Sequence, residues 1–221
     1  GRLTPYQARV CSEQGPEALA VGSYLLEDRL AGDRRWECFV ARQPGNASRV
    51  RLTRLRVAEA DLDAVLLRLQ RGIEDGRRRA ATQLLRPQAA QRVGDQLVVV
   101  SPLEAGRSLG ELLVRRGRFP LEVVLEVMRQ MAAGLGSLER SQQWHGDLRL
   151  RHVQITAEGR LQISLAGVLA AMEPWVTIHA DLPPDAYDGI APELIDTRQE
   201  RTLASDLYAA GCLWWTLLAG R

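Results

Sequence analysis

The spacing of apolar residues changes near residue 103, and this change most limits what the chain can fold into. Between residues 23 and 57, apolar and polar residues alternate in separate runs, which is typical of strands with one buried face. The sequence PGNAS divides the last two runs and predicts a hairpin turn. Two more runs surround Gly94-Asp95, so we expect a sheet-rich first half that ends near Leu103.

One helix is predicted within this first half. Apolar residues recur every three or four positions between residues 62 and 69, as on one face of a helix. Gly72 and Gly76 follow, and we expect them to break or kink this helix. Residues 1–22 are mixed and polar, and we interpret them as an N-terminal extension.

The second half is predicted to be mainly helical. Ser108 and Glu111 have the spacing of a capping box, which predicts a helix start. A long helix is expected over 121–143, a short strand near 161–165, and an apolar helix over 205–220. Strands followed by helices indicate the α+β fold class.

Composition excludes several classes of function. Net charge is +2, and the 29 basic residues, all of them Arg, are mixed with acidic ones, so we expect no nucleic-acid partner. Cys11, Cys38 and Cys212 are too far apart to suggest disulfides or a metal site, which indicates a reduced, cytoplasmic compartment. The longest apolar run, 163–172, is too short to cross a membrane.

The stretch HGDLRLRHVQI, residues 145–155, resembles the catalytic loop of protein kinases, H-R-D-L-x-x-x-N. His145, Asp147 and Leu148 match that pattern. The Arg of the pattern is replaced by Gly146, and the Asn by His152. Aminoglycoside and choline phosphotransferases also use H-G-D, so this loop alone does not identify the family.

Two later motifs favour the protein kinases. Ala191-Pro192-Glu193 matches A-P-E, and SDLYAAGCLWWTLLAGR at 205–221 resembles the central buried helix of the kinase helical lobe. The chain is thus similar to eukaryotic-like Ser/Thr protein kinases. The resemblance implies a bilobal fold, with an N-lobe over 23–103 and a C-lobe over 104–221 that ends soon after this helix.

The same resemblance implies an ATP site, whose Gly-rich loop maps onto LAGDRRWECFVA, residues 30–41. The positions of the three glycines hold Ala31, Asp33 and Trp36. An Asp would repel phosphate, and a Trp is too bulky for close backbone approach. We therefore expect ATP binding to be weak or absent.

The phosphate-binding Lys of the family maps onto Thr53, within Val50-Arg51-Leu52-Thr53. Thr53 is neutral and too short to reach a phosphate. Arg51 lies on the same strand face, because side chains alternate along a strand. Its guanidinium would either fill the base pocket or reach a phosphate itself. Arg54 is expected on the other face.

Both Mg²⁺-ligand positions are also altered. The Asp of D-F-G is Leu165, which has no oxygen ligand, and the Asn of the catalytic loop is His152, a poor ligand for Mg²⁺. We therefore predict no metal site. Asp147 remains at the position of the catalytic base, where we interpret it as a vestige that orders its loop.

We therefore interpret the chain as a pseudokinase, a degenerate kinase-like domain that regulates or scaffolds through protein contacts. The expected partner is an active kinase or its substrate, and no ATP or Mg²⁺ cofactor is expected. Two alternatives remain open. The chain could be a nucleotide-binding switch without turnover, or a divergent active Ser/Thr kinase that uses Asp147 with Arg51 or Arg54.

Overall fold

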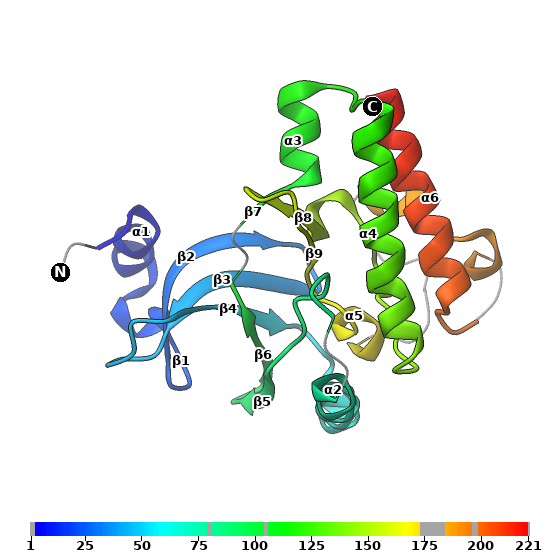
Figure 1. Ribbon diagram of the computed structural model, residues 1–221. Coiled ribbons are helices and arrows are strands. Elements are labelled where there is room, and N and C mark those ends of the chain that lie inside the picture. Colours follow the sequence, from blue (N-terminus) through cyan, green and yellow to red (C-terminus); the bar gives the residue numbers. More distant parts are fainter. Residues whose placement is uncertain (1–2, 79–80, 104–105, 173–183, 196–198, 221) are drawn as a thin grey trace. The chain divides into compact units, whose positions relative to one another are not determined.

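The computed structural model describes residues 3–78, 81–103, 106–172, 184–195 and 199–220 (Figure 1). It divides into two compact units. The sheet unit comprises residues 1–70 and 87–103, and the helical unit comprises residues 71–86 and 104–221. The chain passes from one unit to the other at residue 103, residues 3–22 lie in the sheet unit, and residues 71–78 and 81–86 lie in the helical unit.

The sheet unit contains one antiparallel sheet in the order β1-β2-β3-β4-β6-β5. Its strands are β1 (Ala20–Val21), β2 (Tyr24–Gly32), β3 (Trp36–Arg42), β4 (Arg49–Leu55), β5 (Ala89–Val93) and β6 (Gln96–Pro102). The five longer strands are those that the alternating runs predict, and the hairpin at PGNAS joins β3 to β4. The two-residue β1, which pairs with β2, was not predicted.

The first residues form a helix that packs on this sheet. Helix α1 (Pro5–Gln14) begins at Thr4, whose hydroxyl accepts a hydrogen bond from the Gln7 amide in a complete capping box. The Gln7 side chain donates to the Leu26 carbonyl of β2 at 2.9 Å, and Val10 is buried with Leu26 and Phe39. A 3-10 turn, η1 (Pro16–Leu19), leads from α1 to β1. The segment interpreted as an extension is therefore part of the core of this unit.

Helix α2 (Leu62–Arg77), preceded by the 3-10 turn η2 (Glu59–Asp61), continues through both glycines that were expected to break it. The expected break was therefore wrong, and each glycine instead leaves room for a neighbouring side chain. A Cβ at Gly72 would lie 3.1 Å from the amide nitrogen of Gln143, and one at Gly76 would lie 3.0 Å from the guanidinium of Arg86. Close approach thus explains the glycines, and the helix absorbs their lower propensity.

The helical unit is built around α4 and α6. Its helices are α3 (Leu109–Arg116), α4 (Leu121–Glu139), α5 (Val168–Met172) and α6 (Leu203–Ala219). A small antiparallel sheet joins β7 (Gly106–Ser108), β8 (Val153–Thr156) and β9 (Leu161–Ile163). Short 3-10 turns are η3 (Leu150–His152), η4 (Pro184–Gly189) and η5 (Pro192–Leu194). In Figure 1, α4 and α6 lie side by side, and they share one apolar core.

Local interactions determine where α3 begins and where α4 ends. Ser108 accepts from the Glu111 amide, and Glu111 accepts from the Ser108 amide, so the predicted capping box is confirmed. Helix α4 ends at Glu139, four residues before the predicted end. It ends early because Gln142 has φ of 50°, a left-handed conformation, and the Gln143 amide bonds back to the Leu138 carbonyl. The α+β class is confirmed.

Candidate active site

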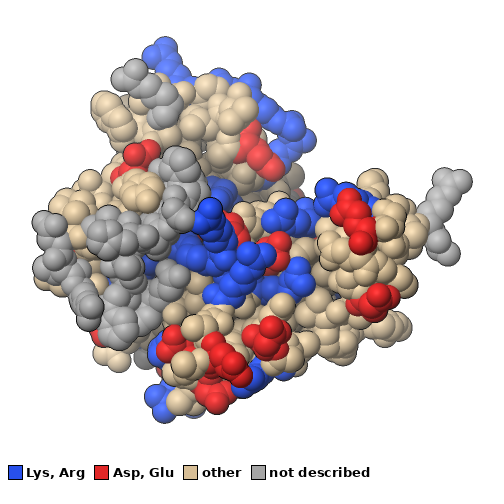
Figure 2. Space-filling view, turned by 180° about the vertical axis from the view of Figure 1, so that it is seen from behind, with Lys and Arg blue, Asp and Glu red and all other residues tan. Residues whose placement is uncertain are grey.

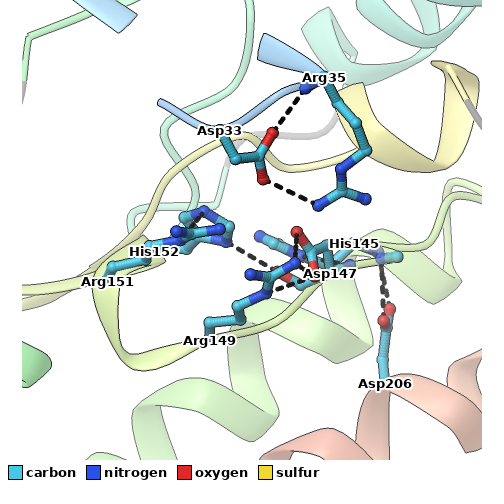
Figure 3. Close-up of polar contacts among 9 residues, drawn as sticks. Asp33, Arg35, His145, Asp147, Arg149, Arg151, His152 and Asp206 are labelled. Carbon is cyan, nitrogen blue, oxygen red and sulfur yellow. Dashed lines mark hydrogen bonds and ion pairs between the residues drawn. The ribbon is translucent and has the colours of Figure 1, made fainter. Parts of the chain in front are cut away.

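The loop 145–152 is anchored by one buried carboxylate (Figure 3). Asp206, in the first turn of α6, accepts hydrogen bonds from the backbone amides of His145 at 2.6 Å and Gly146 at 2.9 Å. Burial raises the pKa of Asp206, whereas His145 and the two amide donors act in the opposite direction. Asp206 thus connects two segments that are sixty-one positions apart in the sequence.

The buried ring of His145 connects the loop to the strand that follows it. Its Nε2 lies 2.9 Å from the carbonyl oxygen of Ser164 and donates to it, while Nδ1 accepts from the Asp147 amide at 3.3 Å. Ser164 in turn donates its amide to the His152 carbonyl at 2.8 Å. These bonds place residues 145–147 next to residue 164, which directly precedes Leu165.

The guanidinium of Arg149 forms a bidentate pair with the carboxylate of Asp147. Its Nε donates to Oδ1 at 2.6 Å, and a terminal nitrogen donates to Oδ2 at 2.7 Å (Figure 3). The side chains are only 5% and 10% exposed, respectively. A bidentate pair of this kind is among the stronger protein interactions. Sequence reasoning missed Arg149, although its position two residues after Asp147 in a loop was a usable signal.

His152 is held through both ring nitrogens. Its Nδ1 lies 2.7 Å from the Asp147 carbonyl oxygen and therefore donates, whereas Nε2 accepts from the Arg151 Nε at 3.3 Å. Both bonds together require the neutral ring. Burial, the largest cause, lowers the pKa of His152 well below its ordinary value, while the Asp147 charge raises it less. With both nitrogens engaged, the ring offers no lone pair to a metal.

Leu165 is fully buried, and its φ is 59°. A leucine in the left-handed region is strained by about 1–2 kcal/mol, whereas Asp and Asn tolerate it. The backbone therefore keeps a shape that suits the Asp of D-F-G, although the side chain has no oxygen. Among the described residues, no three His, Cys, Asp or Glu side chains are grouped so that they could hold a metal. Mg²⁺ does not fit these residues.

Gly146 occupies a position where no other residue fits without rearrangement. Its φ is 81°, and a Cβ would lie 3.0 Å from atoms of Ala170 and of Arg201. Arg201 is buried, and its side chain lies next to the place where the Arg of the family pattern would begin. Sequence reasoning noted the missing Arg but did not identify Arg201 as the cation at this place.

In the sheet unit, the predicted phosphate cradle is the turn between β2 and β3. Asp33 accepts from the Arg35 amide at 2.8 Å and from its guanidinium at 3.1 Å (Figure 3), and the Asp33 amide donates to the Trp36 carbonyl at 2.9 Å. These two amides are thus engaged within the turn and do not fit a role as phosphate donors. Arg35 compensates the Asp33 charge, so the expected repulsion of phosphate is weaker than Asp33 alone would cause.

The residues at the two remaining cradle positions take part in packing and strand pairing. Trp36 begins β3 and is buried, so its side chain packs in the interior. Ala31, near the end of β2, is half-buried and pairs with Cys38 of β3.

Thr53 and Arg51 lie on β4, both buried. The Thr53 hydroxyl lies 3.1 Å from the Cys38 sulfur. On the opposite face, the Arg54 guanidinium lies 4.7 Å from the centre of the Phe39 ring and pairs with Glu37 at 3.1 Å. The predicted alternation, with Arg51 and Thr53 on one face and Arg54 on the other, agrees with these contacts.

Comparison with known proteins agrees with this geometry. Residues 80–221 match the family model described as protein tyrosine and serine/threonine kinase. The chain is 32% identical over 123 residues to the serine/threonine-protein kinase PknA of Corynebacterium glutamicum, covering 56% of this chain and 26% of that protein. It is 33% identical over 116 residues to drp72, a serine/threonine-protein kinase of Corynebacterium efficiens, covering 52% and 22%. The chain thus spans about a quarter of the length of these relatives.

Solved structures show the same fold. The kinase domain of PknI from Mycobacterium tuberculosis superimposes with a TM-score of 0.69, 22% identity, and coverage of 91% of this chain and 74% of that domain. A double mutant of the same domain gives a TM-score of 0.72 at 21% identity, with coverage of 91% and 77%. The predicted bilobal kinase-like fold is confirmed. Within the described part of the chain, no helix is both long and apolar enough to cross a bilayer.

Proposed function

We propose that this chain, which belongs to the protein tyrosine and serine/threonine kinase family, is a pseudokinase. A pseudokinase is a kinase-fold domain that binds proteins and does not transfer phosphate. The observation that carries this proposal is the catalytic loop itself. Asp206 holds the loop in place, but the residue at one metal-ligand position is the buried Leu165, and at the other it is His152, whose ring nitrogens are both engaged.

The proposal follows from what phosphoryl transfer requires. The reaction needs metal ions on the phosphates, a cationic clamp, backbone donors and a carboxylate that orients the nucleophile. Here Thr53 replaces the Lys, and the Asp33 and Arg35 amides bond within their own turn. The Asp147 carboxylate is paired with Arg149. A framework that lacks the metal ligands, the Lys clamp and free backbone donors is suited to presenting a surface, and we place it in the cytoplasm, bound to an active kinase or its substrate.

A divergent active kinase is the second candidate, and the retained Asp147 favours it. Its carboxylate lies in a loop that is anchored by two hydrogen bonds from backbone amides to Asp206. Arg149 would then serve as a cation close to the reacting groups, and Arg51 would replace the missing Lys. A nucleotide-binding switch without turnover is the intermediate case, in which ATP binds but Asp147 does no chemistry.

Two measurements on the full chain separate these functions. Radiolabelled phosphate transfer, with Mg²⁺ or Mn²⁺ and a generic protein substrate, should give no signal above background. Transfer that Asp147→Asn abolishes, while the exposed variant Arg160→Ala keeps it, would establish the active kinase. Calorimetric titration with ATP, with and without Mg²⁺, then tests for the switch. The proposed pseudokinase gives no heat in either titration, whereas binding without turnover indicates the switch.

A variant distinguishes the two roles of Arg51. If its guanidinium fills the base pocket, Arg51→Ala should recover ATP binding that the wild type lacks. If it contacts phosphate, the same substitution should weaken binding that the wild type has.

A further inference from the structure

A hollow on the helical unit has no role in the site described above. It has a volume of about 590 Å³ and lies where α3, the loop 117–120, the start of α4 and the small sheet meet. Its apolar lining is contributed by Leu112, Phe119, Pro120, Val123 and Ile155. Leu112, Phe119 and Ile155 also pack against the core of the unit, so the floor of this groove is preformed.

Three arginines line the same groove. They are Arg107 of β7, Arg116 of α3 and Arg118 of the following loop, and no Asp or Glu is among the lining residues. Within the described residues, none of the three has an ion pair or a side-chain hydrogen bond. In Figure 2, several arginine side chains lie on the part of the helical unit at the top of the view.

An ordinary structural explanation covers only part of this pattern. Arg116 lies in the last turn of α3, where a cation interacts favourably with the helix dipole. Arg107 and Arg118 lie outside any helix, so the dipole does not account for them. Three cations without carboxylate partners around an apolar floor indicate a ligand that is both apolar and negatively charged.

We propose that this groove binds an acidic, amphipathic segment of a partner protein. Apolar side chains of the segment would enter the groove between Leu112 and Ile155, as helix-in-groove recognition requires, and flanking Asp or Glu side chains would pair with the arginines. Charge complementarity of this kind mainly sets specificity and association rate. This proposal rests on the proposed protein-binding function and adds to it a surface and a class of partner. If the groove does not bind such a segment, the protein-binding function can still hold, because a partner could bind elsewhere.

A synthetic probe tests the inference on the full chain. The probe is a fluorescein-labelled peptide of about fifteen residues, with Leu or Phe at every third or fourth position and Glu between them. Fluorescence anisotropy should show saturable binding that weakens as salt is raised. A peptide with Lys in place of every Glu should not bind.

Neighbouring arginines on α3 provide a matched pair of variants. Both Arg115 and Arg116 lie in its last turn, but only Arg116 lines the groove. Arg116→Glu should therefore weaken peptide binding about tenfold or more, and Arg115→Glu by less than about twofold. Val123→Asn should also weaken binding several-fold, since Val123 is 43% exposed and lines the groove, while the melting temperature is retained.

Several results would overturn the inference. Equal losses for Arg115→Glu and Arg116→Glu would indicate only general attraction between opposite charges. Equal binding of the Lys peptide, or no binding of the Glu peptide, would show that the groove does not select acidic segments. If the chain dimerised and Arg116→Glu abolished the dimer, the occupant of the groove would be a second copy of the chain. If the chain preferred phosphatidylserine vesicles to the peptide, the groove would bind a membrane surface.

Discussion

Arg149 donates to both carboxylate oxygens of Asp147, at 2.6 and 2.7 Å, and the two nearly buried side chains form a bidentate pair within one loop. The residue at the position of the catalytic base therefore has a strong electrostatic partner two positions away. The Asp147 backbone is engaged as well, because its amide donates to His145 and its carbonyl accepts from His152. Asp147 thus links the neighbouring parts of the loop.

We expect Arg149→Ala to destabilise the domain by about 3 kcal/mol, because it removes the bidentate Arg149 cation from the nearly buried Asp147 carboxylate. Chemical unfolding followed by fluorescence would measure this. The control is Arg160→Ala, which removes an exposed pair with Glu158 and should cost less than about 1 kcal/mol. Equal losses of unfolding free energy for the two variants would show that the Asp147 pair stabilises the domain no more than an exposed ion pair does.

His152 predicts a loss of stability in mild acid. Its pKa in the folded protein lies well below 6.5, while the unfolded chain binds a proton near pH 6.5. The unfolded state thus holds more protons below that pH, and stability falls as pH falls, by up to about 1.4 kcal/mol per pH unit. Unfolding free energies between pH 7.5 and pH 5 would measure the slope, and His152→Asn should reduce it. An unchanged slope in the variant would assign it to other groups.

Restoring the Arg of the family pattern should destabilise the chain. Gly146→Ala already adds left-handed strain and a Cβ that meets Ala170 and Arg201 at 3.0 Å. The matched control is Gly159→Ala, whose φ of 75° is similar but whose Cβ would have no neighbour within 4 Å. We expect a cost of about 1–2 kcal/mol at Gly159 and about 2 kcal/mol more at Gly146. Thermal melts compare them directly, and equal costs would exclude the steric contribution.

A single surface change should stabilise the helical unit. Gln142 is exposed and has φ of 50° at the end of α4, so Gln142→Gly should raise the free energy of unfolding by about 0.5–1 kcal/mol. Gln142→Ala keeps a Cβ at the same φ, and we expect it to leave stability within about 0.5 kcal/mol of wild type. If both variants behaved alike, the left-handed conformation would not be the source of strain.

The elements of the fold could largely be predicted from local patterns. Strand alternation depends on neighbouring side chains, and the capping box of Ser108 and Glu111 involves residues three positions apart, so each is visible in a short window. The end of α4 was less predictable, because the conformation of Gln142 depends on the bond from Gln143 back to Leu138. Gly72 and Gly76 misled the prediction because the side chains that approach them, Gln143 and Arg86, lie outside the helix, and Gln143 is 71 positions from Gly72.

The sequence by itself determined which chemical groups stand at each position of the candidate site. Leu165 lacks an oxygen ligand and Thr53 lacks a positive charge in any conformation. Only the tertiary structure decided what the retained groups do. The anchoring of the loop by Asp206, the burial of Arg201 beside Gly146 and the gathering of arginines around one apolar groove depend on how segments meet in space. Residue identity sets which interactions are available, whereas long-range packing sets the distances and burial on which their strength depends.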